Sequence, residues 1–394
     1  MADLFNPTSE HAELRRMVRR FAEREVAPQA AEYDRAEKFN RALFQRLGSE
    51  LGLLGITVDP EVGGSGMDAV AAVIAHEELA AVDPGFCLAY LAHAMLCVNN
   101  LEQNGSEAQR ARLMPGLCDG SLIGGMCMSE PGAGTDVLGM KTSAVRRGDS
   151  YILNGAKMWI TNGAVSDTEL GDVFLVYART EPGRGAAGVS MFIVEKGMPG
   201  LSLGQRIKDK LGMRASPTAE LVFEDCVVPV ENRVGEEGTA THHMMRNLEI
   251  ERLTLAAMSL GIARRCVEIM NRYAQDRQSF GQPISRFGQI QRHIAESYAE
   301  YMAGRAYVYG TAANLQLDKG GNRLDSDGVK LYCSTMAKNV ADRAIQVLGG
   351  YGYIGEYHVE RLWRDAKLLE IGGGTVEAHQ KNITRDLARL DALR

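Results

Sequence analysis

The chain has 394 residues, which exceeds one typical domain and predicts two or three folded units with enough apolar residues for a sizeable core. Hydrophobic residues make up 45% of the sequence and charged residues 24%, which is the composition of a soluble globular protein. The net charge is -6, and no basic stripe with interleaved aromatic residues occurs, so the sequence argues against nucleic-acid binding. We therefore expect partners that are small molecules or other proteins.

Cysteine and histidine usage narrows the chemistry further. The seven cysteines are odd in number and contain no CxxC pair, which predicts buried, reduced thiols. The eight histidines show no HExxH or other metal-ligand spacing, so we expect no metal site. No apolar run approaches the ~20 residues of a membrane span, and the first residues resemble neither a signal nor a transit peptide. We therefore expect no membrane-spanning segment.

The first part of the chain has a helical pattern, from residue 8 to about residue 120. A turn-rich stretch, residues 59–68, separates an early pair of helices from later ones. Residues 84–101 form an apolar helical stretch without Lys or Arg, in which we expect His93 to be a core histidine rather than a ligand. These features predict an N-terminal helical domain over residues 1–122.

The pattern changes to β after about residue 121. The stretch YILNGAKMWITNG contains two Asn-Gly turn signals, which flank an alternating segment. Three further β-rich runs follow with Gly and Pro between them, namely VFLVYART, GVSMFIVEK and AELVFEDCVVPV. We expect a small antiparallel β domain over residues 123–237.

Helical patterns return in the last part of the chain, residues 238–394, which we expect to be a C-terminal helical domain. The expected helices cover residues 241–275, 285–318, 325–348 and 376–391. The predicted fold class is therefore mainly α with a central antiparallel β domain.

A GxGxxG pattern occurs at Gly350, Gly352 and Gly355. A nicotinamide-binding fingerprint of this kind needs a strand before it and a helix after it, whereas the preceding run AKNVADRAIQVLGG is helical. We therefore interpret these glycines as a turn that ends a helix.

Two other motifs contain residue types that bind planar or phosphorylated ligands. The loop SEPGAGTDV lets backbone N–H groups approach a ligand, and MWITNG follows it with the Trp159 ring and the Thr161 hydroxyl. In RQSFG, the Arg277 guanidinium and the Phe280 ring suit a phosphate and a purine. Taken singly, the first motif is better explained as an ordinary β-domain turn and the second as a solvated arginine beside a core phenylalanine.

A carboxylate lies on the apolar stripe of the first C-terminal helix. Apolar residues recur there at spacings of three and four, and Glu251 falls in the same series. A carboxylate on such a stripe is paired, protonated or catalytic. Glu249, two residues away, faces another direction and is the weaker candidate for catalysis. The apolar members of the stripe are Leu248, Leu255, Met258 and Ile262.

Seven motifs, in this order and across nearly the whole chain, resemble the acyl-CoA dehydrogenase family of flavoenzymes: SEPGAGTD, KMWITNG, EKGMPG, KLGMR, DRQSFG, QVLGGYGY and RDAKLLEIGGGT. The resemblance implies an N-terminal helical domain, a β-barrel-like middle domain and a C-terminal four-helix bundle. It also implies bound FAD, an acyl-CoA substrate, an electron-transfer flavoprotein as electron acceptor, and a homotetramer. The location would be the cytoplasm of a bacterium or the mitochondrial matrix of a eukaryote.

The resemblance assigns roles to residues that match the family's motifs. Residues along the flavin ring and its linker would be Met126, Met128, Ser129, Thr135, Trp159, Ile160, Thr161, Thr375 and Glu377. Residues that contact the adenosine diphosphate part of an FAD held by a neighbouring subunit would be Arg277, Phe280, Gln346, Gly349 and Gly350. Substrate contacts would come from Thr135, His242, Arg252, Gly373 and Gly374. One position departs from the pattern, because Gly288 stands where many relatives have Gln.

The catalytic base follows from the same resemblance. Many relatives carry a glutamate in the loop just before Gly-Thr, where this chain has Gly373. The isovaleryl-CoA dehydrogenase branch carries its base in the first C-terminal helix, immediately before an arginine, and Glu251-Arg252 matches. We therefore expect FAD-dependent α,β-dehydrogenation with Glu251 as the base. We also expect the loop glycines to leave room for a short or medium branched acyl chain.

Other readings of the sequence stay open. The substrate could be a longer branched, terpenoid or cyclic acyl-CoA, since several branches lack the loop glutamate. An acyl-CoA oxidase or a flavin monooxygenase of the same fold would share the flavin motifs. A non-catalytic flavin- or CoA-binding module would need no buried carboxylate at Glu251.

Overall fold

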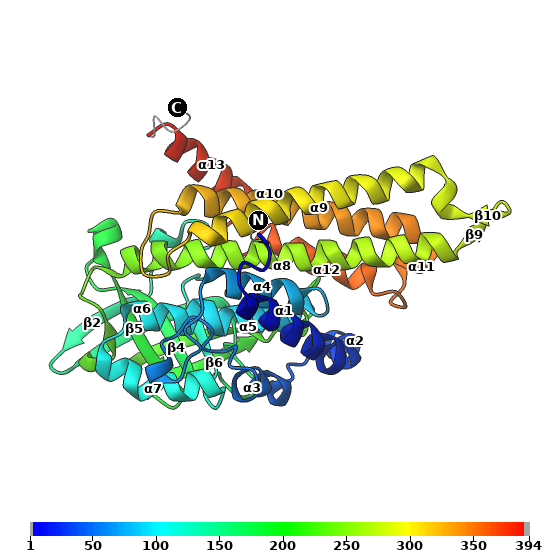
Figure 1. Cartoon of the computed structure of the whole chain (residues 1–394). Coiled ribbons are helices and arrows are strands. Elements are labelled where there is room, and N and C mark those ends of the chain that lie inside the picture. The colour runs from blue at the N-terminus through cyan, green and yellow to red at the C-terminus, as the bar shows by residue number, and fades with distance from the viewer. Residues whose placement is uncertain (1–2, 390–394) are drawn as a thin grey trace.

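The computed structural model describes residues 3–389, and Figure 1 shows its architecture. Three long helices, α8, α9 and α10, lie side by side across the top of this view. The sheet and the N-terminal helices lie below them, with the sheet toward the left end. The hairpin β9–β10 projects beyond the right end. The helices and the central sheet confirm the predicted fold class.

The N-terminal segment is helical, as predicted, and side-chain caps begin several of its helices. The Thr8 side chain accepts from the His11 N–H, and Asp68 caps the helix after the turn-rich stretch by accepting from the Ala71 N–H. The elements are α1 Ser9–Phe21, η1 Ala22–Val26, α2 Ala27–Ala36, α3 Arg41–Ser49, η2 Pro60–Val62, α4 Ala69–Ala80, α5 Pro84–Leu91, η3 Ala92–Val98, α6 Asn99–Asn104 and α7 Glu107–Asp119.

The apolar helix expected over residues 84–101 is not a continuous α-helix, because η3 is a π-helical segment in its middle. His93 lies in this segment and is fully bonded. Its Nε2 donates to the Leu117 carbonyl over 2.8 Å, and its Nδ1 accepts from the Gly124 N–H over 2.9 Å. Burial lowers the pKa of His93 to about 4, so the ring is neutral. The expectation of a core histidine is confirmed.

The middle segment forms one eight-stranded sheet with the order β6-β7-β3-β2-β4-β5-β8, and β1 pairs β4 off this path. The ladders are antiparallel, as predicted, except that β1 runs parallel to β4 and a single parallel pair joins β2 to β4. The strands are β1 Gly124–Cys127, β2 Ser143–Arg147, β3 Ser150–Thr161, β4 Val173–Arg179, β5 Val189–Glu195, β6 Leu201–Arg206, β7 Thr218–Pro229 and β8 Arg233–Val234. Short 3-10 turns lie between them at η4 Val137–Gly139, η5 Gly185–Gly188 and η6 Val230–Asn232.

The first of the two Asn-Gly signals is not a turn, which corrects the sequence prediction. Strand β3 continues through Asn154 and Gly155, and its register with β7 shifts there as a β-bulge. Gly155 has φ +144°, and a Cβ atom on it would lie 2.6 Å from the Thr142 Oγ1. The glycine therefore serves a close approach of two chain segments. The second signal, Asn162-Gly163, directly follows the end of β3, as expected.

The C-terminal segment contains the long helices, and α8 runs without interruption over 37 residues. Gly349, with φ +60°, directly follows the end of α10, so a helix ends just before the GxGxxG stretch, as predicted, but Gly350 and Gly352 lie in the short helix α11 rather than in a turn. The helix expected over residues 376–391 ends at Leu387, and its last two expected residues lie outside the described part. The elements are α8 Ala240–Asp276, β9 Gln278–Ser279, β10 Gln282–Pro283, η7 Ile284–Arg286, α9 Gly288–Asn314, α10 Arg323–Leu348, α11 Gly350–Tyr353, α12 Val359–Leu369 and α13 Val376–Leu387.

Three general features of the described residues bear on function. All seven cysteines are free and buried, as predicted. Within residues 3–389, no cluster of three or more His, Cys, Asp or Glu side chains is arranged to hold a metal ion. Over the same residues, no helix combines the length and the apolar character that crossing a membrane requires.

Candidate active site

Glu251 lies in the middle of α8 and is buried, with 6% of its surface exposed. Its Oε2 atom has no hydrogen-bond partner. Burial raises the pKa of this carboxyl group to about 7, against the opposing charges of Arg252 and Lys330. A buried carboxyl group that titrates near neutral pH and lacks a partner is suited to accept a proton.

The surroundings of Glu251 on α8 are more buried than the sequence pattern indicated. All four predicted apolar members of the stripe are buried, but so is the whole of α8 from residue 247 to residue 263. Glu249 is therefore also buried. Its side chain points toward the segment just before α10, which agrees with its predicted position off the stripe. There it accepts hydrogen bonds from two backbone N–H groups, that of Gly321 over 3.2 Å and that of Asn322 over 2.8 Å. Glu249 is thus engaged in a structural role.

The loop between α12 and α13 packs against Glu251 at Gly373. Gly373 has φ +69°, which favours glycine, and a Cβ atom on it would overlap the Leu255 Cδ1 and lie 3.4 Å from the Glu251 Oε1. At Gly374, with φ +110°, a Cβ atom would lie 2.9 Å from the His379 Cε1. These contacts correct the expectation that the glycines leave open space for a substrate. The side chains of the chain itself occupy that space.

Buried cations hold the carbonyl groups of this loop. Arg252 Nε donates to the Gly373 carbonyl over 3.4 Å, and Lys330 Nζ donates to the carbonyls of Leu369 and of Gly374, the latter over 3.5 Å. In the described part of the chain, the backbone N–H of Gly373 has no hydrogen-bond acceptor. The loop therefore has its carbonyls anchored in the protein and an N–H group free to donate.

Trp159 lies near the end of β3, where the register with β7 shifts, and has φ +64°. Its side chain is 62% exposed, which is unusual for a large ring in a packed domain. A hydrogen bond of 2.9 Å from the Met158 N–H to the Ser129 carbonyl ties this strand to the SEPGAGTDV loop. A Cβ atom on Gly132 or Gly134 of that loop would meet no atom within 4 Å. An exposed indole beside an open, glycine-containing loop is suited to contact the face of a planar ligand.

The other residues assigned to the flavin ring lie on several elements. Met126 and Ile160 are buried, and Asn100 Nδ2 lies 3.9 Å from the Met126 sulfur. Thr375 caps α13 by accepting from the Ala378 N–H over 3.3 Å, and Glu377 is exposed in the first turn of that helix. Of the remaining members, Met128, Ser129 and Thr161 are partly buried and Thr135 is exposed.

The residues assigned to the adenosine diphosphate lie elsewhere, at the end of the long helices where the hairpin β9–β10 projects (Figure 1). Phe280 is 93% exposed, and the Arg277 guanidinium lies 5.8 Å from the centre of the Tyr351 ring, next to Gly350. Arg277 is roughly 39 Å from Glu251 along the axis of α8. The residues assigned to the adenosine diphosphate therefore lie far from Glu251 of the same chain. The remaining members, Gln346, Gly349 and Gly350, are exposed at the same end.

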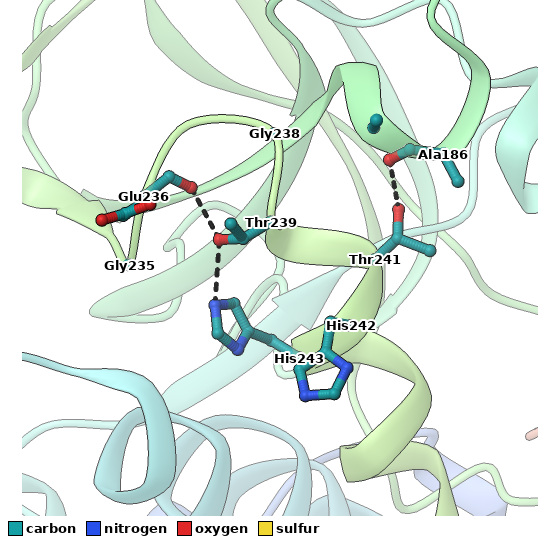
Figure 2. A pocket seen from close by; sticks show the side chains of 9 residues that line it. Ala186, Gly235, Glu236, Gly238, Thr239, Thr241, His242 and His243 are labelled. Atoms are coloured by element: carbon teal, nitrogen blue, oxygen red, sulfur yellow. Dashed lines mark hydrogen bonds between the residues drawn. The ribbon is translucent and has the colours of Figure 1, made fainter.

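A cavity of about 570 Å³ lies where η5 meets the start of α8 (Figure 2). His242, which the resemblance assigned to the substrate, lines it together with Ala186 and Ala187. The Thr241 hydroxyl donates to the Ala186 carbonyl over 2.8 Å and so joins the two segments. The cavity therefore lies about two and a half turns of α8 before Glu251.

Comparison with known proteins identifies the family of this chain. Models of the N-terminal, middle and C-terminal domains of acyl-CoA dehydrogenase match residues 8–121, 125–226 and 241–388. The chain belongs to the acyl-CoA dehydrogenase family. It is 42% identical to the mitochondrial isovaleryl-CoA dehydrogenase of Oryza sativa subsp. japonica, over 98% of this chain and 92% of that protein.

Solved structures agree with this assignment. Butyryl-CoA dehydrogenase from Megasphaera elsdenii superposes with a TM-score of 0.92 at 35% identity, over 97% of this chain and 99% of the other. A chain from a structural study of the electron transferring flavoprotein of Acidaminococcus fermentans superposes with a TM-score of 0.93 at 36% identity, with the same coverage. The protein is thus an acyl-CoA dehydrogenase, an oxidoreductase.

Sequence reasoning missed three buried residues of this acyl-CoA dehydrogenase. Asp327 and Lys330 lie one turn apart on α10, and His379 lies in the first turn of α13. Nothing in their local pattern distinguishes them from surface residues of the same helices. The only available signal was the i, i+3 spacing of Asp327 and Lys330, which places both on one face.

Proposed function

We propose that this acyl-CoA dehydrogenase removes the α proton of an acyl-CoA thioester with Glu251 as the general base. The observation that carries the proposal is the buried Glu251 carboxyl group, which has an unpartnered oxygen and lies against the Gly373 loop. Its pKa of about 7 lets it be ionised in part near neutral pH and still bind the proton that it removes. Glu249 cannot replace it, because that carboxylate accepts hydrogen bonds from the backbone N–H groups of Gly321 and Asn322, just before α10.

FAD is the proposed cofactor. The exposed Trp159 ring, with Ser129 and Thr161 beside it, would hold the flavin ring, and the open loop at Gly132 and Gly134 would admit its linker. Bound FAD supplies an acceptor for the hydride that leaves the β carbon of the substrate. The protein's own contribution is to place the acyl chain between this ring and Glu251.

The thioester carbonyl is proposed to accept from the free N–H of Gly373. Negative charge develops on that oxygen when the α proton leaves, and a fixed donor stabilises it. Arg252 acts on this glycine from its other side, because its Nε donates to the Gly373 carbonyl, which belongs to the next peptide of the loop. The cavity at His242 and Ala187 lies further toward the start of α8 and is the proposed path of the CoA moiety.

The acyl group is proposed to be short and branched, like isovaleryl. Two observations support this choice: the similarity to the isovaleryl-CoA dehydrogenase of rice, and the lack of any Asp, Glu, Lys or Arg over residues 84–101, which by resemblance to the family would form the wall beside the acyl chain. A dicarboxylic acyl group would require a cation in such a wall. The room for branching does not come from Gly373, since Leu255 fills the space beside it.

The active unit is proposed to be at least a dimer and, by family resemblance, a tetramer. Arg277 and Phe280 lie too far from Glu251 along α8 to meet the same cofactor, so they would serve an FAD bound mainly by a neighbouring chain. The proposed electron acceptor is an electron-transfer flavoprotein, in keeping with the family and with the structural neighbour from the Acidaminococcus study.

Anaerobic titration with acyl-CoAs tests the proposal, with flavin absorbance as the readout. Isovaleryl-CoA should bleach the flavin, and straight chains of equal carbon number should do so more slowly but measurably, because a methylene in an apolar pocket contributes only ~1–3 kcal/mol. Protein that binds no FAD, or flavin that no acyl-CoA reduces, would refute the proposed function. Admission of air after reduction separates a dehydrogenase, which reoxidises slowly, from an oxidase.

A further inference from the structure

A group of buried charged residues packs against the glycine loop. Asp327 Oδ1 is 3.1 Å from Arg252 Nη1 and 2.5 Å from His379 Nδ1. Asp327 thus joins three helices, α10, α8 and α13, at one atom. Its side chain is completely buried. A buried carboxylate with two partners fixes the orientation of both.

Both partners of Asp327 contact the peptide of the loop. Arg252 Nε donates to the Gly373 carbonyl, and the His379 ring lies against Gly374, so close that a Cβ atom there would be 3.1 Å from Nε2. Burial lowers the pKa of His379, which makes the ring neutral, with Nδ1 donating its proton to Asp327. Asp327 therefore controls the position of both loop glycines without touching either one.

We propose that Asp327 is a positioning residue: through Arg252 and His379 it fixes the peptide that follows the Gly373 Cα atom, and thereby the conformation of Gly373 in which the N–H of the preceding peptide points at the thioester carbonyl. This inference rests on the proposed function, since it assigns the Gly373 N–H to the substrate. Lys330, one turn further along α10, holds the carbonyls of Leu369 and Gly374 and fixes the two ends of the loop. Asp327 then fixes the backbone conformation of Gly373, which lies between those ends.

The test compares two CoA ligands with the same carbon skeleton. Dimethylacrylyl-CoA is a thioester, whereas 3-methylbut-2-enyl-CoA is a thioether that keeps the same double bond and has a methylene in place of the carbonyl. Only the thioester can accept from the Gly373 N–H. Asp327→Asn should therefore weaken thioester binding about tenfold, the effect expected when a hydrogen bond to a buried group is lost, and leave thioether binding within about twofold. Binding to the FAD-loaded protein is measured by calorimetry.

Control variants separate positioning from stability. Asp325→Asn alters an exposed carboxylate two residues earlier on α10 and should change neither ligand's affinity. His379→Gln removes one partner of Asp327 and should give a smaller loss for the thioester alone, which provides a second reading if Asp327→Asn folds poorly. Equal weakening of both ligands by these variants, or none for either, would overturn the positioning role. Wild-type protein that binds neither ligand would instead refute the proposed function, and this inference with it.

Discussion

The Glu251 Oε1 atom lies 3.4 Å from the position that a Cβ atom on Gly373 would take, so the carboxylate from α8 occupies the place next to the loop from which a loop side chain would otherwise project. Leu255, one turn further on the same helix, fills the rest of that space. The loop glycine and the helix glutamate are therefore two parts of one arrangement. In it, the base comes from a rigid helix rather than from the loop.

This arrangement predicts the effect of removing the base. Glu251→Gln preserves the shape of the side chain but cannot accept the α proton. Flavin reduction by isovaleryl-CoA should fall by at least ~100-fold, while FAD and acyl-CoA still bind. Stopped-flow absorbance under anaerobic conditions measures the rate. Glu249→Gln, a control of identical chemistry on the same helix, should change the rate far less, and a normal rate in Glu251→Gln would show that the base lies elsewhere.

The raised pKa of Glu251 predicts a pH dependence of flavin reduction. The base works only when ionised, so the reduction rate constant should rise with pH and level off above about 7. The profile is measured with the acyl-CoA saturating and pH varied by mixing. A rate that stays constant through this range would contradict the assigned pKa.

The same pKa has a consequence for stability. The folded chain binds the Glu251 proton more tightly than the unfolded chain, whose carboxyl group has its ordinary pKa of 4.5. The stability that this proton contributes is full at low pH and is lost as pH rises from 4.5 toward about 7. Glu251→Gln removes this loss, so it should raise the free energy of unfolding by about 1–3 kcal/mol at about pH 8 and change it little relative to the wild type at about pH 4. Urea denaturation of the FAD-free protein measures both values.

The two glycines before Gly374 should tolerate substitution differently. Gly373→Ala demands a strained φ and a shift of Leu255, and we expect a loss of about 1–3 kcal/mol in stability together with slower flavin reduction. Gly372→Ala is the matched control, because its Cβ atom would meet its nearest neighbour, the Leu368 carbonyl oxygen, at 3.6 Å, an ordinary contact. Thermal melting and the reduction rate of both variants check this. Equal tolerance at the two positions would mean that the loop has a different conformation.

Cofactor retention should depend on the far end of α8. Arg277→Ala should weaken FAD binding by roughly 5–30-fold, the effect of a lost charge-assisted phosphate contact, without changing the order of preference among acyl-CoAs. Arg272→Ala removes an exposed arginine on the same helix, one turn earlier, and should have no effect. FAD release during dilution is followed by flavin fluorescence. An active monomer in light scattering would refute the shared cofactor site.

Much of this molecule could be predicted from the sequence because its signals are local or periodic. The order of helices, sheet and helices follows from the change of hydrophobic period, and Glu251 was identified because it interrupts an apolar series. The role of Glu249 was predictable only in part, since its partners at Gly321 and Asn322 come from another element.

The features that the sequence did not reveal depend on contacts between distant segments. Gly155 was expected in a turn. The structure instead shows that a side chain at this position would collide with Thr142 on the neighbouring segment. The open space expected at Gly373 is filled by Leu255, which lies 118 positions earlier in the numbering of the chain. Asp327 meets Arg252 and His379 only because three helices converge. Periodicity describes the faces of one element and carries no information on which faces meet.

The length of α8 has a consequence for oligomers that contain two different defective variants. One helix carries the proposed base at Glu251 and, roughly 39 Å away, the arginine proposed to serve a neighbour's FAD. A chain with Glu251→Gln can therefore still lend Arg277 to its neighbour, and a chain with Arg277→Ala can still supply Glu251. Co-expression of these two defective chains would assemble hybrid oligomers in which some centres are whole, so the mixture would combine FAD retention and activity that neither variant has alone.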